Sequence, residues 1–436
     1  MGFRRSILAL SWVALCVLTA CPAPSSQVPT TPSPSKDGKE GSEPPVLASP
    51  RSSSNSKEIA FGEEASFTLD KKALRASGGA TLVSKLESSP YHYFRFVSRE
   101  FEARTCFAFR DVKHQLPVVA VHGDAHLEQF VVTSDTYGLE DFDRSGYGPA
   151  VVDLVRFASS IDVACKQAKF ACDSTAAMEK YLASYRDAID KPRERLPPPS
   201  VAARVQRKAP QDRKAWLAWV DTQMKPLSKE EDARTRKSFA AFVDLQRAVH
   251  PDRPAEFYEI VRLGELKMGV GSSLERKLLF RIRGPSTDPS DDVVLEARSG
   301  DITESSGCVW RPTHNTALHV LLFMSLIGPR MPDVIGFVSL DRAPDNRPFW
   351  VQSWNPGYVE LSATDIQSQA ELEELAASAG QQLAGHFWTK FPEQLRAFQR
   401  FAQLQAFDLV RPRVLTVARE LSKEIVAAQV AFTSAQ

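Results

Sequence analysis

The residues best suited to chemistry gather in one stretch of this 436-residue chain, between positions 121 and 143. Six of its polar side chains could act as acids, bases or ligands: His122, Asp124, His126, Gln129, Asp141 and Asp143. Phosphoryl transfer needs one carboxylate to orient the attacking group, and further carboxylate and amide oxygens to hold Mg²⁺ against the phosphates. The stretch contains these types of residue, with Asp124 as the candidate base and Asp141 as the main candidate metal ligand.

The order of these residues resembles two known groups of proteins. The chain reads HGDAHLEQF from His122 and EDFD from Glu140. A large uncharacterised bacterial family has HGDAHLENF followed by NDFD, and the aminoglycoside and choline phosphotransferases of the protein-kinase-like superfamily have HGDxHxxN followed by a metal-binding carboxylate. The resemblance implies a catalytic loop around Asp124, with His122 and His126 beside it. It also implies Mg²⁺, held by Gln129, Asp141 and Asp143, and ATP or another phosphate donor.

Positions outside the central stretch match the same bacterial family: Arg95, Asp153, Arg156, Gly269, Gly271, Ser272 and Arg298. The resemblance implies that Asp153 braces the catalytic loop by accepting its backbone N–H groups, although Asp153 and Arg156 at helical spacing could simply pair. It also implies that the glycine-rich segment approaches phosphate through its backbone. Arg298 stands at the family's lysine position, where it would supply positive charge.

The chain departs from the family pattern at several of these positions. Gln129 is one methylene longer than the usual Asn, and Mg²⁺ tolerates little displacement of a ligand. Glu140 replaces an Asn, and Arg298 cannot reproduce the compact ammonium of a lysine. Two alternatives therefore stand beside the phosphotransferase or nucleotide-binding protein. One is a catalytically silent scaffold that binds an envelope partner, and the other is a metal-dependent hydrolase that uses His122, Asp124 and His126 as ligands.

The elements that must position these residues are short strands and amphipathic helices. Apolar β-branched runs predict strands at 116–121, 130–133, 139–142, 259–283, 293–298 and 349–354. Helical periodicity predicts helices at 67–111, 150–166, 174–189, 233–249 and 364–436. The basic, proline-containing segment 191–214 is expected to be a surface loop. Helices followed by a small sheet and further helices indicate an α+β fold. Because the glycine-rich segment follows the catalytic loop, the resemblance implies a two-lobed, rearranged protein-kinase-like fold.

The N-terminal residues predict that the protein is exported from the cytoplasm. Residues 1–20 have two arginines and a short apolar run, which is typical of a signal peptide. Leu18-Thr19-Ala20-Cys21 resembles the lipobox of bacterial lipoproteins, so we expect Cys21 to carry lipid that anchors the protein at the outer membrane, facing the periplasm or the exterior. Residues 21–57 form a proline- and serine-rich tether, and residues 58–436 form the folded domain.

Charge and cysteine content limit the partners and the redox state. Lys and Arg number 54 against 53 Asp and Glu, so nucleic acid is not expected as a partner, and the acceptor would be a small molecule or a protein. Besides Cys16 and Cys21, four cysteines allow three disulfide pairings: Cys106, Cys165, Cys172 and Cys308. In a continuous helix Cys165 and Cys172 would be about 10 Å apart, too far for a bridge. We therefore expect these four cysteines to be either buried free thiols or disulfides.

Overall fold

The computed structural model describes residues 65–191, 196–210, 212–266, 276–299, 307–311, 316–339, 348–385 and 393–435. All of them belong to one unit, Ile59–Gln436. The predicted signal peptide, lipidation site Cys21 and tether lie outside the described residues, as do Gly269, Gly271 and Ser272. Among the helices that are described, none is both long and apolar enough to cross a membrane.

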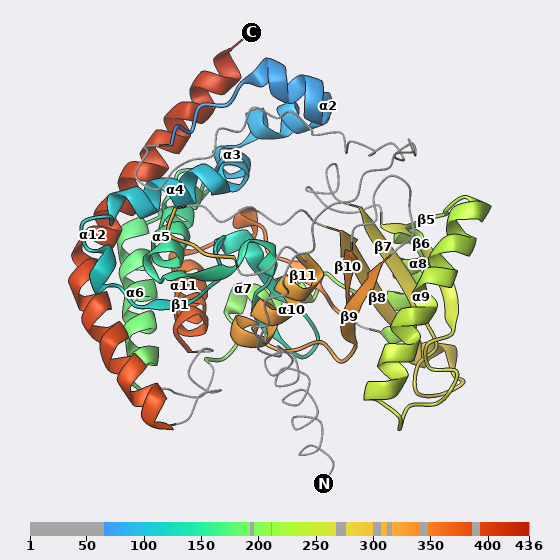
Figure 1. Cartoon of the computed structure of the whole chain (residues 1–436). Coiled ribbons are helices and arrows are strands. Elements are labelled where there is room, and N and C mark those ends of the chain that lie inside the picture. The colour runs from blue at the N-terminus through green and yellow to red at the C-terminus, as the bar shows by residue number, and fades with distance from the viewer. Residues whose placement is uncertain are drawn as a thin grey trace, which may run out of the picture. The chain divides into compact units, whose positions relative to one another are not determined.

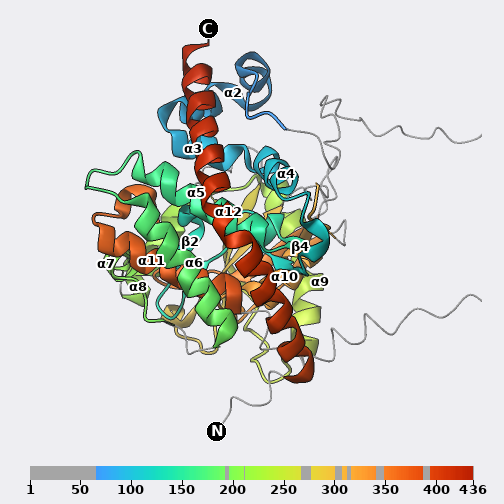
Figure 2. The same cartoon turned by 90° about the vertical axis from the view of Figure 1, so that its left-hand side faces the viewer.

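Eight helices of the described chain pack around the largest apolar core: α2 (Lys71–Ser88), α3 (Pro90–Phe96), α4 (Ser98–Ala108), α5 (Val151–Cys165), α6 (Ser174–Asp190), α7 (Ser200–Gln206), α11 (Gln369–Gly385) and α12 (Glu393–Ser434). Residues 151–164 of α5 are all buried, which places this helix at the centre of the core. Helix α12 runs along the outer flank of the group (Figures 1 and 2). Asp70, Ser89 and Asp173 cap the first turns of α2, α3 and α6 with their side-chain oxygens.

A six-stranded antiparallel sheet forms the second part of the fold, in the order β5–β6–β7–β8–β10–β9. Its strands are β5 (Met224–Lys225), β6 (Ile260–Leu266), β7 (Lys277–Ile282), β8 (Val293–Ser299), β9 (Ile335–Ser339) and β10 (Pro348–Ser353). Alternate side chains point to opposite faces. Leu278 and Phe280 pack against α9 (Lys229–Val249), whereas Leu279 and Val294 pack against α8 (Arg213–Gln223).

Two smaller groups of strands position the predicted site between these parts. Strand β1 (Val118–Val121) pairs with β4 (Gly146–Pro149), and β2 (Phe130–Val132) pairs with both β3 (Tyr137–Leu139) and β11 (Val359–Glu360). Helix α10 (Thr316–Ile327) packs on β10 and β1. The chain thus leaves β1 for the predicted catalytic loop, turns through the β2–β3 hairpin and returns to Asp141.

The α+β, helix-rich fold predicted from the sequence is confirmed. The segment 191–214 was wrongly expected to be a surface loop. It contains α7 (Ser200–Gln206), whose residues Val201, Ala202 and Val205 are fully buried. Three apolar residues at helical spacing outweigh the surrounding basic charge. Short 3₁₀ turns complete the elements: η1 (Lys113–Gln115), η2 (Leu127–Gln129), η3 (Phe142–Arg144), η5 (Pro289–Asp291) and η6 (Ala363–Asp365).

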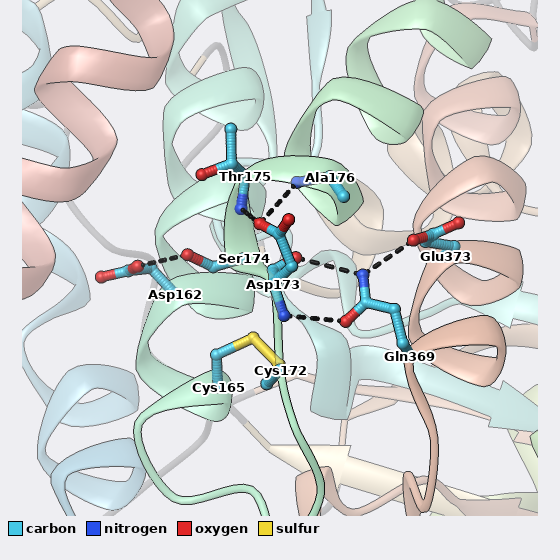
Figure 3. Close-up of a disulfide and its surroundings, with 9 residues drawn as sticks. All are labelled: Asp162, Cys165, Cys172, Asp173, Ser174, Thr175, Ala176, Gln369 and Glu373. Atoms are coloured by element: carbon cyan, nitrogen blue, oxygen red, sulfur yellow. Dashed lines mark hydrogen bonds between the residues drawn. A yellow bond between two sulfur atoms is a disulfide. The ribbon is translucent and has the colours of Figure 1, made fainter.

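The four remaining cysteines form two disulfides, Cys106–Cys308 and Cys165–Cys172. The distance of about 10 Å would apply only to a continuous helix, which the chain does not form between Cys165 and Cys172. Helix α5 ends at Cys165 and the chain reverses before α6, so their Cα atoms are 5.4 Å apart. Figure 3 shows this disulfide beside Asp173, the N-cap of α6, whose backbone N–H donates to Gln369 of α11.

Candidate functional site

The loop after β1 is braced by Asp153 of α5. Its carboxylate accepts the backbone N–H groups of His122 (2.7 Å) and Gly123 (2.8 Å). These are the contacts expected for Asp153 from the sequence. Gly123 has φ +78°, and a Cβ atom there would lie 2.1 Å from the carbonyl oxygen of Arg144. The loop can therefore close against Arg144 only with glycine at this position.

Asp124, the predicted catalytic carboxylate, is paired with Arg156 rather than left free. Nε and one terminal nitrogen of Arg156 each lie 2.8 Å from Oδ1 of Asp124. Arg156 is 1% exposed, stacks 3.6 Å from the ring centre of Phe94 and donates to the Phe94 carbonyl. The sequence allowed Asp153 and Arg156 to pair with each other. In the structure each of them instead contacts the loop after β1, Asp153 through the backbone N–H groups of the loop and Arg156 through Asp124.

Both predicted histidines of the loop are buried. Nε2 of His122 lies 2.9 Å from the Glu140 carbonyl, and its Nδ1 accepts the backbone N–H of Asp124 at 3.4 Å. The ring of His126 packs edge-on against Tyr91 and Phe94. Neither of its nitrogens has a hydrogen-bond partner among the described residues, and Nε2 is 3.9 Å from Asp124. Burial lowers the pKa of His126 well below its ordinary value, so the ring is neutral in the fold.

We expect the stability contribution of His126 to depend on pH. The unfolded chain takes up a proton on His126 below about pH 6.5, whereas the folded chain does not, so this contribution is lost as the pH falls below 6.5. Replacing His126 with Phe, which suits the aromatic surroundings, removes the dependence. The unfolding free energy of the wild type should fall relative to His126→Phe by up to about 1.4 kcal/mol per pH unit below 6.5 in urea titrations. His114→Gln, at an exposed position, serves as the control, and a constant difference between wild type and His126→Phe would contradict the prediction.

A cavity of about 170 Å³ lies between the β2–β3 hairpin and the sheet, and we call it the polar cavity. Its cations are Arg95, Lys277 and Arg298, and its carboxylates come from Glu128, Glu140, Asp141, Asp143 and Glu360. Gln129 and Gln352 contribute amides. The structure thus brings five sequence-predicted residues together: Arg95, Gln129, Asp141, Asp143 and Arg298. Of the described residues that line the cavity, none is His122, Asp124 or His126.

Asp141 occupies a special position in this cavity. Its φ of +71° is the only positive φ of a non-glycine residue in the described part of the chain. Asp tolerates this left-handed conformation better than most residues. Oδ1 lies 3.4 Å from a terminal nitrogen of Arg298, which in turn stacks over Trp350 at 5.2 Å. Burial raises the pKa of Asp141, but the charges of Arg298 and Lys277 outweigh this effect and hold the pKa below its ordinary value.

The neighbouring Glu140 behaves in the opposite way. Burial, together with the negative charges of Glu296 and Asp141, raises its pKa to about 7. Two adjacent carboxyl groups therefore differ in charge state near neutral pH, with Asp141 ionised and Glu140 partly protonated. Such separation of pKa values is common where a site binds ions or moves protons.

The wall of the polar cavity near α3 is fixed by Glu128. One oxygen of Glu128 pairs with Arg95 at 3.0 Å, and the other accepts the backbone N–H of Ala363 at 3.0 Å. Arg95 thus contacts the loop through Glu128, which was not predicted from the sequence as a site residue. The position of Glu128 inside the HGDAHLEQF segment was the available signal.

An aromatic recess of about 340 Å³ adjoins the polar cavity. It is lined by Trp216, Trp219, Trp354 and Tyr358, with ring centres 5.6–6.3 Å apart in the contacting pairs. Four residues line both the recess and the polar cavity: Lys277, Arg298, Tyr358 and Glu360. The two spaces therefore form one site with a charged end and an aromatic end.

The charged end has the donor chemistry of a Mg²⁺–phosphate site. Within the described residues, no three His, Cys, Asp or Glu side chains are grouped as a metal site. Mg²⁺, however, often takes only one or two carboxylates from the protein and completes its shell with water and phosphate. Oδ1 of Asp141 and Oε1 of Gln352 are buried without a hydrogen-bond partner among the described residues, and both residues line the cavity. These oxygens, with Gln129 and Asp143 nearby, fit a hard cation that arrives with phosphate.

Comparison with known protein families gives a match over part of the chain. Residues 81–259 match a family described as "Uncharacterized protein conserved in bacteria (DUF2252)". The match includes the loop after β1, the hairpin and α5, but it ends before the strands that carry Lys277 and Arg298. Neither a curated protein nor a solved structure matches the chain.

Proposed function

We propose that the protein binds a Mg²⁺–nucleotide or a related phosphate compound in the polar cavity and the adjoining aromatic recess, as the binding step of a kinase-like phosphotransferase. The observation that carries the proposal is that Asp141 lines the polar cavity with Arg298, at 3.4 Å, and Lys277, beside a recess of tryptophan rings. The rings offer a stacking surface for a base, while Lys277 and Arg298 offer charge to the phosphates.

The connectivity of the sheet supports the same proposal. Strands β6, β7 and β8 follow one another in sequence and in space, and α10 intervenes before β9 and β10. In protein kinases a glycine-rich loop covers the phosphates and a strand of the same small sheet carries the phosphate-binding lysine. Here Gly269 and Gly271 fall between β6 and β7 in the sequence, and Arg298 lies on β8.

The two disulfides support a location outside the cytoplasm. Disulfides persist in oxidising compartments and are rare in the cytosol. Together with the signal peptide and Cys21 expected from the sequence, they favour a lipid-anchored protein of the bacterial cell envelope. ATP is scarce there, so the phosphate donor could be another nucleotide or polyphosphate.

A second function is favoured by the state of Asp124. The predicted base pairs with Arg156 and is not among the described residues that line the cavity. A protein of this kind could bind its phosphate ligand without transferring it and act as a scaffold for an envelope partner. The metal-dependent hydrolase gains less from the geometry, because His122 uses both ring nitrogens in hydrogen bonds and His126 is enclosed by aromatic rings.

Replacing Asp141 with Asn tests the binding proposal. Asn keeps the shape and tolerates the left-handed backbone, but it removes the charge that would hold Mg²⁺. The full chain in detergent is titrated with ATP, GTP, ADP and polyphosphate, with and without Mg²⁺, while thermal unfolding is followed. A ligand at 100 times its Kd should stabilise the wild type by about 2.7 kcal/mol. Asp141→Asn should abolish the Mg²⁺-dependent part of this shift.

The exposed Asp187 provides a matched control, since Asp187→Asn removes the same charge from the surface of α6. It should respond to ligand as the wild type does. A wild type that no nucleotide or polyphosphate stabilises, or an Asp141→Asn variant with an unchanged Mg²⁺-dependent shift, would contradict the proposal. Binding without transfer to any acceptor would favour the scaffold.

A further inference from the structure

Lys277 and Arg298 face each other across neighbouring strands. Strands β7 and β8 are antiparallel, and their register pairs Lys277 directly with Arg298. Directly opposed residues project from the same face of a sheet, with Cβ atoms about 4.5–5.5 Å apart. Both side chains line the polar cavity and the aromatic recess. The site therefore contains two adjacent cations where the family pattern implies one.

Arg298 is already committed to the protein. A terminal nitrogen lies 3.4 Å from Oδ1 of Asp141, and the guanidinium stacks over Trp350, its neighbour on β10. The Arg298 side chain is only 15% exposed. Moving it toward a ligand would break its ion pair with Asp141 and its stacking contact with Trp350, which is costly in a largely buried site.

Lys277 has a longer ion pair than Arg298 and, among the described residues, no stacking contact. The ion pair of its ammonium within the described residues is with Glu296, at 3.9 Å, which is longer than a hydrogen bond. Its side chain is 11% exposed, so it lies inside the site rather than in solvent. Glu296 lies two residues before Arg298 on the same face of β8 and lines the aromatic recess together with Lys277. A compact ammonium on a flexible chain, with three donors and one distant partner, can take up phosphate oxygens without breaking a short contact.

We propose that Lys277, rather than Arg298, contacts the phosphate groups of the bound ligand, and that Arg298 serves as the fixed counter-ion of Asp141. The assignment rests on the proposed function and names the cation that the site uses.

The two roles predict opposite effects of two charge-removing variants. Calorimetric titration of the full chain in detergent with Mg²⁺–ATP and Mg²⁺–pyrophosphate gives the affinity, and thermal unfolding without ligand gives the stability. Lys277→Met should raise the Kd at least tenfold and change the melting temperature little. Arg298→Met should raise the Kd less but lower the melting temperature more, because Asp141 and Trp350 lose their partner. Lys225→Met, on the exposed edge strand β5, should match the wild type in both measurements.

The remaining outcomes separate the assignment from the proposed function. If Lys277→Met fails to fold because Glu296 is left unpaired, Lys277→Gln combined with Glu296→Gln removes both charges and should still show the tenfold loss of affinity. Lys277→Arg, which keeps the charge, should recover part of the affinity. A larger loss of affinity in Arg298→Met than in the Lys277 variants would overturn the assignment and leave the binding site in place. A wild type that binds neither ligand would overturn both.

Discussion

Replacing Arg156 with Met should lower the free energy of unfolding by about 3–5 kcal/mol, the usual cost of leaving a buried charge without its partner. Asp124 is 7% exposed and Arg156 is 1% exposed, so water cannot compensate for the lost contact. The guanidinium also fills the space beside the rings of Phe94 and Phe101, which methionine occupies only in part. Urea denaturation of the wild type and the variant measures the difference.

A double-mutant cycle separates the ion pair from the packing. Asp124→Asn and Arg156→Met together should cost clearly less than the sum of the two single variants, because the double variant leaves no unpaired charge. Arg411→Met is the matched control, since Arg411 pairs with Glu179 on the surface and such pairs contribute about 0–1 kcal/mol. Equal losses in Arg156→Met and Arg411→Met, or strict additivity in the cycle, would show that the pair does not support the loop.

The same pairing changes what an activity assay of Asp124 can show. Asp124→Asn would be the direct test of the base predicted from the sequence. In the structure it also removes the counter-ion of a buried arginine. A loss of activity in this variant would therefore have two causes, so Asp141 and Lys277 are the better residues for testing function.

The sequence predicted the parts of the site that depend on short stretches of chain. Gln129 and Asp141 lie at the two ends of the β2–β3 hairpin, so their spacing and the composition of the turn were enough to predict that they lie close together. The bracing contact of Asp153 could be anticipated because the family pattern includes it. The partner of Arg156 could not be predicted, because Asp153 and Arg156 lie three residues apart and share one face of α5. Which of the two side chains reaches Asp124 depends on how closely the loop after β1 packs against this helix.

The remaining parts depend on strand register, which no local pattern defines. Lys277 and Trp350 both flank Arg298, but their sequence separations from the loop are large, and a shift of one residue in β7 would turn Lys277 to the face covered by α9. Helix α10 was not predicted because its apolar residues run without a polar face. Its burial against β1 and β10 explains that composition.

The disulfide Cys106–Cys308 should contribute more to stability than Cys165–Cys172. The first closes a chain segment with a sequence separation of 202 and the second one with a separation of 7. In the chain-entropy account, these loops correspond to about 5 and about 2 kcal/mol, respectively. The double variant Cys106→Ala with Cys308→Ala should therefore lose roughly twice as much unfolding free energy as Cys165→Ala with Cys172→Ala, measured by urea denaturation under oxidising conditions.

The location of Cys106–Cys308 gives this difference a consequence for the site. Residues 307–311 follow β8 in the chain and lie against β4, where Trp310 bridges Tyr147, and Arg311 pairs with the buried Glu102 of α4 at 2.7 Å. Arg311 also donates to the carbonyl of Arg144, the group that closes against Gly123. Loss of the Cys106–Cys308 bond should therefore loosen the turn that follows Asp141, with faster amide hydrogen exchange at residues 141–147, whereas loss of Cys165–Cys172 should leave exchange there unchanged. Equal exchange at 141–147 in the two double variants would show that the bond stabilises the chain without supporting the site.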